Sequence, residues 1–289
     1  MQAVGDSKHP LYYLIISSLT NVVLDIILIT VFDMGVDGAA LATVISQLLS
    51  VVLCAVRLLR TKEDYRVSLK FIRMDFPMLR EIISYGIPAG VQNSVIGFAN
   101  VIVQSNINAF GAMAVAGCGA YSKIEGFVFL PITSFVIALT TFISQNLGAK
   151  EYDRAKKGAR FGILCAVLIS ALIGVITYIT APLCIRAFTR EPEAIAFGVQ
   201  KARTCSVFYA LLAATHSISA VLRGAGKSVV PMMTMLIVWC VIRVLFLIVF
   251  VPIFHDIAVV NWVYPLTWFI STTFLLFYYK KSDWLHHFS

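Results

Sequence analysis

Long apolar runs, separated by short polar stretches, repeat along the whole chain. A run of about 18 or more apolar residues is long enough to cross a bilayer as a helix, which satisfies its own backbone hydrogen bonds. The pattern predicts about eight membrane-spanning helices, at 11–32, 38–59, 82–110, 117–147, 161–185, 196–222, 229–251 and 257–279. We therefore expect an all-α fold, a polytopic helical bundle embedded in the lipid bilayer.

Composition and charge support a membrane protein and set its orientation. Of the 289 residues, 59% are hydrophobic and only 13% are charged, which excludes an ordinary soluble domain. Lys and Arg cluster after the second, fourth, sixth and eighth spans, so the positive-inside rule places both termini in the cytoplasm of a plasma-membrane protein. The same clustering explains the net charge of +8 without a nucleic-acid partner. Four residues near the outer side are exceptions to this pattern: Arg186, Arg190, Lys201 and Arg203.

One charged residue, Asp25, lies within the first predicted span. A buried carboxylate costs roughly 3 kcal/mol or more at the centre of a membrane helix, and is therefore a candidate functional group. Asn21 precedes Asp25 by four residues, so both lie on one helix face. An amide oxygen and a carboxylate on one face can bind a proton or a small cation. The alternative is that Asp25 ties two helices together by hydrogen bonds.

The third predicted span carries a stripe of polar side chains. Asn93, Gly97, Asn100, Gln104 and Asn108 follow one another at intervals of 4, 3, 4 and 4 residues and share one face, with Gln92 beside them. Amides facing lipid are costly. The stripe therefore indicates a water-filled cavity that contacts substrate, although hydrogen bonds between helices would also explain it.

Glu125, Arg243 and His216 also lie inside predicted spans and are candidates for the same cavity. Glu125 and Arg243 each lie about 12 Å from the outer end of their spans, by a rise of 1.5 Å per residue. We expect these two residues to form an ion pair, because an unpaired buried charge is the costlier state, although both could also lie in the water-filled cavity without touching. His216 is a lone histidine that could relay protons, but packing is the favoured interpretation.

Two short segments of the chain are similar and indicate an internal repeat. Gly5-Asp6-Ser7-Lys8 precedes the first span, and Gly224-Ala225-Gly226-Lys227 precedes the seventh. Each segment leads into a long span that contains one buried charge, Asp25 or Arg243. Since both follow a cytoplasmic loop, the repeat is of the parallel kind found in some transporters.

An ordered set of motifs resembles the multidrug and toxin extrusion (MATE) transporters of prokaryotes. Those resembling the N-terminal half of the family are Gly5-Asp6-Ser7-Lys8-His9-Pro10, Asn21-x-x-x-Asp25 and Gly35-Val36-Asp37-Gly38-Ala39-Ala40-Leu41-Ala42-Thr43. Those resembling the C-terminal half are Tyr85-Gly86-Ile87-Pro88-Ala89-Gly90, Gln145-Asn146-Leu147-Gly148-Ala149 and Leu222-Arg223-Gly224-Ala225-Gly226. The motifs keep the order of the family along the whole chain.

The resemblance implies a two-lobe fold of twelve helices, of which this chain matches the fifth to the twelfth. Residues 1–60 would be the end of the N-terminal lobe, 61–81 a cytoplasmic linker, and 82–289 a six-helix C-terminal lobe. A further four-helix segment is then expected before Met1 as a partner. By resemblance, Asn21, Asp25 and Thr43 form the proton or cation site. The family's sodium-coupled branch also carries a Glu on the third span, where this sequence has Gln92 and Asn93.

The resemblance implies secondary active efflux of organic compounds, cationic or amphipathic, driven by antiport of H⁺ or Na⁺. One alternative is a related flippase for lipid-linked oligosaccharides, which a basic cavity would favour. The other is a non-transporting fragment, or one chain of a split transporter. An enzyme is not expected, because the sequence has no nucleophile–base set, metal cluster or phosphate loop. No cofactor or metal is expected beyond the coupling ion, with Na⁺ at Asp25 as one form of it.

Overall fold

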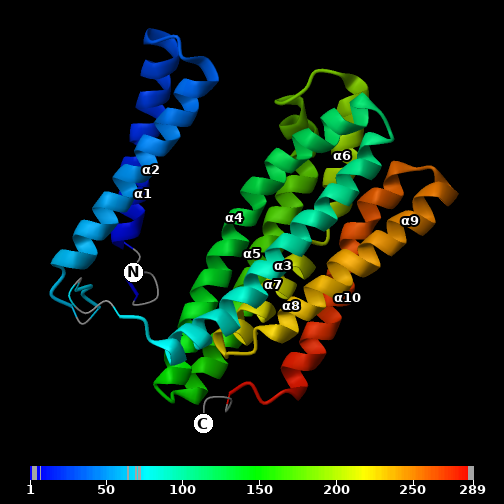
Figure 1. Cartoon of the computed structure of the whole chain (residues 1–289). Helices are drawn as coiled ribbons and strands as arrows, with labels where there is room; N and C mark the ends of the chain where they lie inside the picture. The colour runs from blue at the N-terminus through cyan, green and yellow to red at the C-terminus, as the bar shows by residue number, and fades with distance from the viewer. Residues whose placement is uncertain (2–4, 7, 64, 69, 71–72, 286–289) are drawn as a thin grey trace. The chain divides into compact units, whose positions relative to one another are not determined.

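The structure is a computed structural model that describes residues 1–289 apart from 2–4, 7, 64, 69, 71–72 and 286–289. The side chains of residues 85, 89, 92 and 93 also lie outside the description. The described residues form helices and no strands (Figure 1). In chain order the elements are α1 (Lys8–Ile26), η2 (Ile27–Val31), α2 (Gly35–Arg60), α3 (Phe76–Asn108), α4 (Ala112–Gly148), α5 (Tyr152–Arg186), α6 (Pro192–Ser206), α7 (Tyr209–Gly224), α8 (Val229–Met235), η4 (Leu236–Ile242), α9 (Arg243–Phe254) and α10 (Ile257–Lys281).

Each predicted span corresponds to a helix or to a run of consecutive helices, so the all-α membrane fold is confirmed. Among the described residues, six helical stretches are long and apolar enough to cross a membrane, and α6 with α7 makes a seventh if the pair is one span. α3, which corresponds to the third predicted span, has 33 residues, about 50 Å at 1.5 Å per residue, and is therefore long enough to cross a bilayer.

The sixth predicted span is not one straight helix. The structure divides 196–222 between α6 and α7, which are bent by 53° at Val207 and Phe208. The backbone turns there with the amide of Phe208 donating to the carbonyl of Cys205, at 3.0 Å. No Gly or Pro marks the bend, which is why the apolar pattern alone predicted a continuous span.

The chain divides into two compact units, Met1–Phe76 and Pro77–Ser289, and each is described by itself. In the first unit, α1 and α2 pack against each other through small buried residues, including Gly38 and Ala42. Ser17 Oγ donates to the carbonyl of Ser46 at 2.6 Å and so joins the two helices. Their other faces are mostly exposed apolar side chains, which suits contact with lipid.

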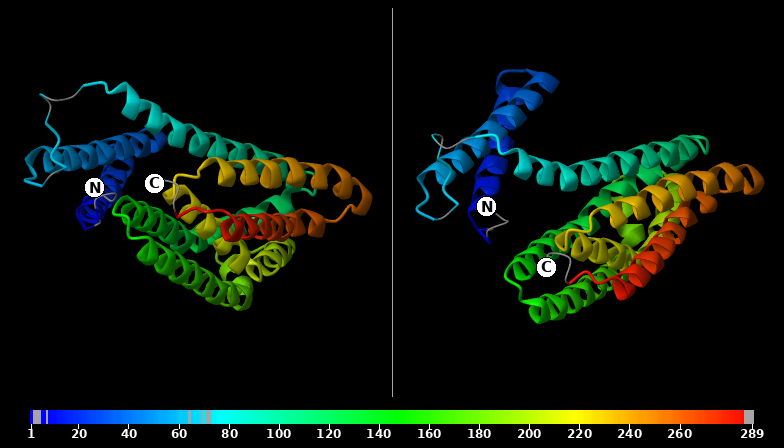
Figure 2. Two further views of the ribbon diagram at one scale, coloured as in Figure 1. Left: turned by 90° about the horizontal axis from the view of Figure 1, so that it is seen from below. Right: turned by 60° about the horizontal axis from the view of Figure 1, so that its bottom comes forward.

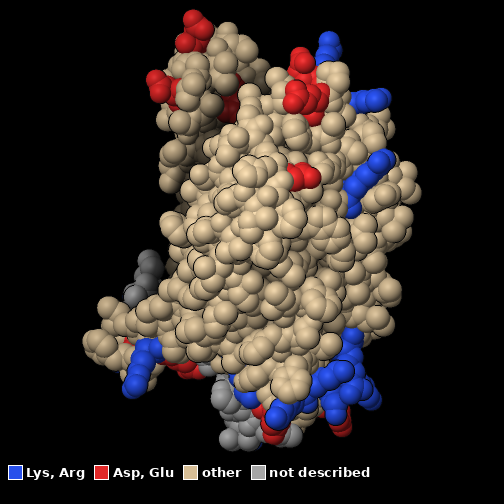
Figure 3. Space-filling model, turned by 90° about the vertical axis from the view of Figure 1, so that its right-hand side faces the viewer, with Lys and Arg blue, Asp and Glu red and all other residues tan. Residues whose placement is uncertain are grey.

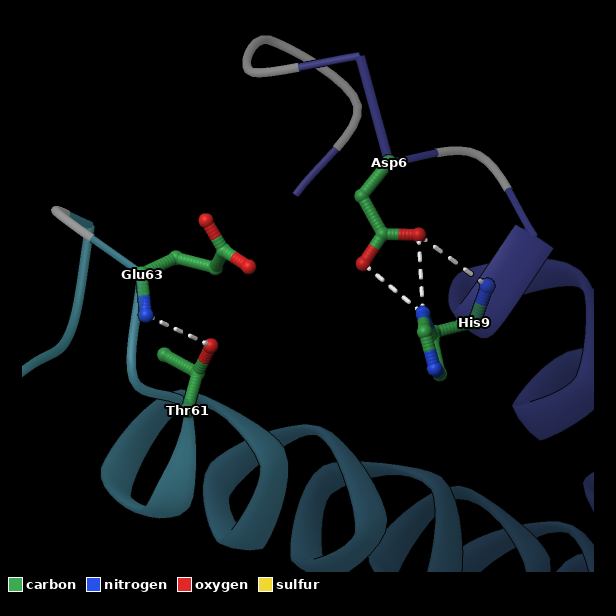
Figure 4. Close-up of polar contacts among 4 residues, drawn as sticks. All are labelled: Asp6, His9, Thr61 and Glu63. Carbon is green, nitrogen blue, oxygen red and sulfur yellow. Dashed lines mark hydrogen bonds and ion pairs between the residues drawn. The ribbon is translucent and has the colours of Figure 1, made fainter.

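The start of α1 is stabilised by a local contact between Asp6 and His9 (Figure 4). The backbone amide of His9 donates to Asp6 Oδ1 at 3.3 Å, and His9 Nδ1 lies 2.9 Å from both carboxylate oxygens. The hydrogen bond from His9 holds the pKa of the Asp6 carboxyl below its usual value.

A second local contact lies at the end of α2, where Thr61 Oγ1 accepts a hydrogen bond from the amide of Glu63 at 3.3 Å (Figure 4). Both contacts satisfy or order backbone groups next to a helix end.

The second unit is a bundle in which α4 packs against α5, α6 and α7, and α10 packs against α6, α7 and α9. α3 borders this bundle on one side, as the turned views show (Figure 2). There Val103 and Ile107 of α3 are buried in one cluster with Cys118 and Leu247. The bundle thereby encloses polar side chains from six elements between apolar clusters.

Charged side chains gather toward the two ends of the second unit on the face that Figure 3 shows. A broad band almost free of Lys, Arg, Asp and Glu lies between them. Such a band matches the hydrocarbon layer of a bilayer, which is about 30 Å thick. The chain is thus a multi-pass membrane protein.

Candidate functional site

The second unit contains a cavity of about 490 Å³, which is the candidate site. It lies between α3, α4, α6, α7, η4, α9 and α10. Its lining combines amides, three charged groups and aromatic rings: Ile96, Asn100, Val103, Gln104, Ile107, Ser122, Glu125, Phe129, Lys201, His216, Trp239, Arg243, Tyr264 and Trp268. Ligand pockets typically have volumes of about 300–1,000 Å³, so this cavity can hold a small organic molecule.

The carboxylate in the cavity belongs to Glu125 of α4. Its Oε1 accepts a hydrogen bond from the Tyr121 hydroxyl at 3.1 Å, one helical turn away. The Tyr121 hydroxyl also lies 3.0 Å from the Tyr209 hydroxyl of α7. Both tyrosines are fully buried, so this chain of hydrogen bonds anchors the carboxylate between α4 and α7.

Arg243 of α9 is 1% exposed and lines the cavity. One of its terminal nitrogens donates to Thr267 Oγ1 at 2.9 Å. Its guanidinium lies 5.0 Å from the ring centroid of Trp239 and 4.8 Å from that of Tyr264. The Nε atom is buried and has no hydrogen-bond partner among the described residues. Thr267 and two ring faces hold this cation.

The ion pair predicted between Glu125 and Arg243 is not present in the described part of the chain. Each group has another partner: Tyr121 for Glu125, and Thr267 with two aromatic faces for Arg243. Both line the same cavity without forming a pair, which was the alternative interpretation. Aromatic faces offset part of the cost of burying Arg243 without a carboxylate partner, because a desolvated cation gains about 2 kcal/mol over such a ring.

Lys201 of α6 is the charged residue of the cavity that the sequence interpretation missed, and the aromatic residues of the lining were not predicted either. It was assigned with Arg186, Arg190 and Arg203 to the outer side of the membrane, but it is 3% exposed and lines the cavity. Its Nζ lies 5.5 Å from the centroid of Tyr121 and 5.0 Å from that of Tyr264. A buried ammonium costs several kcal/mol, which two ring faces at about 2 kcal/mol each offset in part.

Lys201 is buried because of its position on α6. α6 is a separate helix of 15 residues, and Lys201 falls on its buried face, together with Gly198, Ala202 and Cys205. Arg203, two positions further, is exposed. A signal was available, since positions 194, 198, 201, 202 and 205 have the spacing of one helical face.

His216 of α7 packs edge-on between two rings of the cavity wall. Its ring centroid lies 5.8 Å from Phe129 and 5.6 Å from Trp239. Its Nε2 is buried without a hydrogen-bond partner among the described residues. Behind the wall, Trp239 Nε1 donates to Ser271 Oγ at 3.2 Å, which fixes the indole beneath Arg243. The favoured packing role of His216 therefore fits, and the residue also lines the cavity.

The predicted polar stripe of α3 faces the cavity along part of its length. Asn100 and Gln104 line it, and Gln104 Nε2 donates to Asn108 Oδ1 at 2.9 Å. Asn108 lies one turn further along the helix and is not part of the lining. Gln92 and Asn93 were predicted to join the same cavity, but their side chains lie outside the described residues.

The first unit holds the second group of predicted residues. Asn21 Nδ2 donates to Thr43 Oγ1 at 3.5 Å, so α1 and α2 bring these two together. Both line a shallow pocket of about 450 Å³ that Ser17 and Ser46 also border. Asp25 is half-buried one turn along α1, and its Oδ1 is buried with no hydrogen-bond partner among the described residues. A buried carboxylate oxygen without a hydrogen-bond partner can accept a proton or a small cation.

The MatE family model matches residues 88–249 of this chain, which is more than half of its length. The sequence is 27% identical over 238 residues to a probable multidrug resistance protein, YoeA, of Bacillus subtilis, covering 80% of this chain and 51% of that protein. It is 24% identical over 249 residues to the probable multidrug resistance protein NorM of Thermotoga maritima, covering 83% and 52%. It is 25% identical over 205 residues to an FAD transporter of Shewanella oneidensis, covering 68% and 44%.

Solved structures show the same fold. A mutant of the Vibrio cholerae MATE transporter VcmN superposes with a TM-score of 0.88 at 21% identity, over 98% of this chain and 65% of that one. A multidrug resistance MATE transporter of the MOP superfamily, in an outward-facing conformation, superposes with a TM-score of 0.85 at 20% identity, over 93% and 61%. The chain spans about half the length of the curated relatives it matches.

Proposed function

Because the chain belongs to the MatE family, whose members are transporters and not enzymes, we propose that it acts in secondary active export of amphipathic organic compounds by alternating access. The observation that carries this proposal is the cavity of the second unit. It has the volume of a small-molecule site and mixes aromatic rings with a few polar and charged groups, as such sites do. The names of the multidrug relatives support export over the flippase alternative.

Export is driven by H⁺ or Na⁺ at the Asp25 site of the first unit. Protonation or cation binding would neutralise the carboxylate whose Oδ1 has no hydrogen-bond partner among the described residues. Asn21 and Thr43 supply an amide and a hydroxyl in the neighbouring pocket. A change of charge at a half-buried position alters the relative stability of two packing states, and the substrate site then changes its access. The scheme requires no organic cofactor. The transporter works within the lipid bilayer.

The first test is efflux from cells that express the 289-residue chain, alone and beside a four-helix segment from a relative's N-terminal half. Two fluorescent dyes serve as reporters, cationic ethidium and anionic fluorescein. We expect Asp25→Asn to abolish efflux, because the amide cannot be protonated or balance a cation. Asp33→Asn is the matched control, since Asp33 is an exposed carboxylate in the turn between α1 and α2.

Each outcome bears on the proposal. Efflux of either dye that is lost in Asp25→Asn and kept in Asp33→Asn supports export with coupling at Asp25. Efflux seen only beside the added segment supports the same function for a larger assembly. No efflux of either dye in either setting contradicts the proposed function, and full efflux by Asp25→Asn contradicts the coupling site.

A further inference from the structure

The cavity of the second unit holds two buried cations and one carboxylate. Lys201 and Arg243 line it at 3% and 1% exposure, and Glu125 is the acidic residue of the lining. In the described part of the chain, neither cation lies within 4.0 Å of a carboxylate oxygen. With His216 neutral, the side chains around the cavity carry a formal charge of +1. A buried excess of positive charge favours an anion as the guest.

The two cations lie close together because they share one aromatic ring. Lys201 Nζ is 5.0 Å and Arg243 Cζ is 4.8 Å from the centroid of Tyr264. The distance between Lys201 Nζ and Arg243 Cζ therefore cannot exceed the sum of their distances to this shared centroid. One terminal nitrogen of Arg243 donates a hydrogen bond to Thr267 Oγ1, while its buried Nε has no hydrogen-bond partner among the described residues. A donor that is desolvated and unpartnered beside a cavity points to a ligand acceptor.

Glu125 does not take the place of this acceptor. Its Oε1 is engaged by the Tyr121 hydroxyl, which is in turn tied to Tyr209. The cations are held by ring faces, and these leave the N–H groups of a guanidinium or ammonium free to donate to a ligand. The lining also includes the aromatic rings of Trp239, Trp268 and Phe129, together with the uncharged amides of α3. The cavity thus offers cationic donors beside an aromatic surface.

We propose that this cavity binds amphipathic organic anions, with an aromatic body against the ring-lined wall and a carboxylate at Arg243 and Lys201. This inference names a substrate class for the proposed export and in that respect rests on it. It departs from the cationic substrates that the family resemblance implies. The binding itself is a property of the second unit and is measured without transport.

The test is calorimetric titration of the purified 289-residue chain in uncharged detergent micelles. The ligands are 2-naphthoate, neutral 2-naphthamide and cationic 2-naphthylmethylammonium, which share one aromatic body. We expect 2-naphthoate to bind roughly tenfold or more tightly than the amide, the effect of one or two charge-assisted hydrogen bonds. Equal affinities, or tighter binding of the amide or the ammonium, overturn the proposal.

Variants locate the site. Arg243→Gln and Lys201→Gln should each remove the preference for 2-naphthoate over the amide. Glu125→Gln should tighten 2-naphthoate binding several-fold, because it removes the negative charge of the cavity. Arg203→Gln is the control, since Arg203 is an exposed cation on the same helix as Lys201. Thermal unfolding of each variant confirms that it is folded.

If the two cation variants do not fold, Glu125→Gln decides, because a structural role of that carboxylate does not predict tighter anion binding. An unchanged or weaker affinity in Glu125→Gln contradicts the proposal. Binding of 2-naphthoate by a chain that exports neither dye would leave the anion site standing and the proposed export failing. Export of ethidium without 2-naphthoate binding would support the proposed export and contradict the anion site.

Discussion

At the scale of single residues, the cavity shows how a membrane bundle accommodates charge without ion pairs. Lys201 and Arg243 are held over the faces of Tyr121, Tyr264 and Trp239, and the Glu125 carboxylate is held by a tyrosine hydroxyl. Charged donors and acceptors that are bound only by neutral partners keep their charge available to a ligand. Aromatic residues therefore set the electrostatics of this site as much as the charged residues do.

The Tyr121 hydroxyl is the central link, since it contacts both Glu125 and Tyr209. We expect Tyr121→Phe to lower the free energy of unfolding by about 1–3 kcal/mol, because two buried polar groups lose a partner. Tyr178→Phe is the control, since Tyr178 is 43% exposed, and it should change stability by less than about 0.5 kcal/mol. Reversible unfolding in mixed micelles measures both. Equal losses in the two variants would show that the hydroxyl contacts contribute no stability.

At the scale of helices, the two repeat segments, 5–8 and 224–227, share structural features that were not evident from the sequence. Gly5 and Gly226 both adopt positive φ, at 84° and 80°, in the turns before the long spans. Each span then contains a π-helical stretch beside its charge: η2 begins two residues after Asp25, and η4 ends one residue before Arg243. Such stretches are frequent at functional sites, because they rotate the side chains that follow.

Helix contacts in the second unit depend on glycine where backbones nearly touch. A Cβ added at Gly117 of α4 would lie 2.2 Å from the carbonyl oxygen of Ala194 and 2.8 Å from the amide nitrogen of Gly198, both on α6. Ala194 and Gly198 are four residues apart, the small-residue spacing that allows close packing of membrane helices. α6 carries Lys201, so this contact also positions the cavity.

We expect Gly117→Ala to destabilise the protein by about 1–3 kcal/mol, because the added methyl group cannot be placed without moving α6. Gly119→Ala is the matched control on the same helix, where nothing lies within 4 Å of the added Cβ. It should be neutral or stabilising, since Ala favours a helix over Gly. Thermal unfolding followed by tryptophan fluorescence compares the two. A similar midpoint for both variants would mean that α4 and α6 can separate at no cost.

At the scale of the whole molecule, the distribution of Lys and Arg predicts the orientation in the membrane. The placement of Lys201 inside the cavity strengthens this prediction, because it leaves Arg186, Arg190 and Arg203 as the exceptions on the outer side. Positive charge on short loops favours the cytoplasmic side. Both termini are therefore predicted to be cytoplasmic.

Cysteine labelling in intact cells tests this orientation. A membrane-impermeant maleimide should label Val36→Cys, in the first turn of α2, because that end is predicted to face outward. Lys62→Cys and Lys156→Cys, in basic segments, should react only after permeabilisation. The unsubstituted chain gives the background from its six native cysteines. The opposite pattern of labelling would show that the chain is inserted the other way round.

The sequence by itself determined the fold class, the order of the apolar helices along the chain, the family and several residues of the cavity. Hydropathy over 20 residues and charge in short loops are local properties, and the bilayer acts on them directly. Among the residues predicted for a cavity, the following line it: Asn100, Gln104, Glu125, His216 and Arg243. Their role in binding, and that of Asn21, Asp25 and Thr43 in coupling, stays a prediction.

Only the tertiary structure decided how the charges are held. Lys201 lies on the buried face of α6 and lines the cavity, and aromatic residues from α4, η4 and α10 took the place of the expected ion pair. A cation's partner is set by which faces of several helices meet. That meeting depends on the packing of residues far apart in the chain, such as Gly117 against Ala194, and no local pattern encodes it.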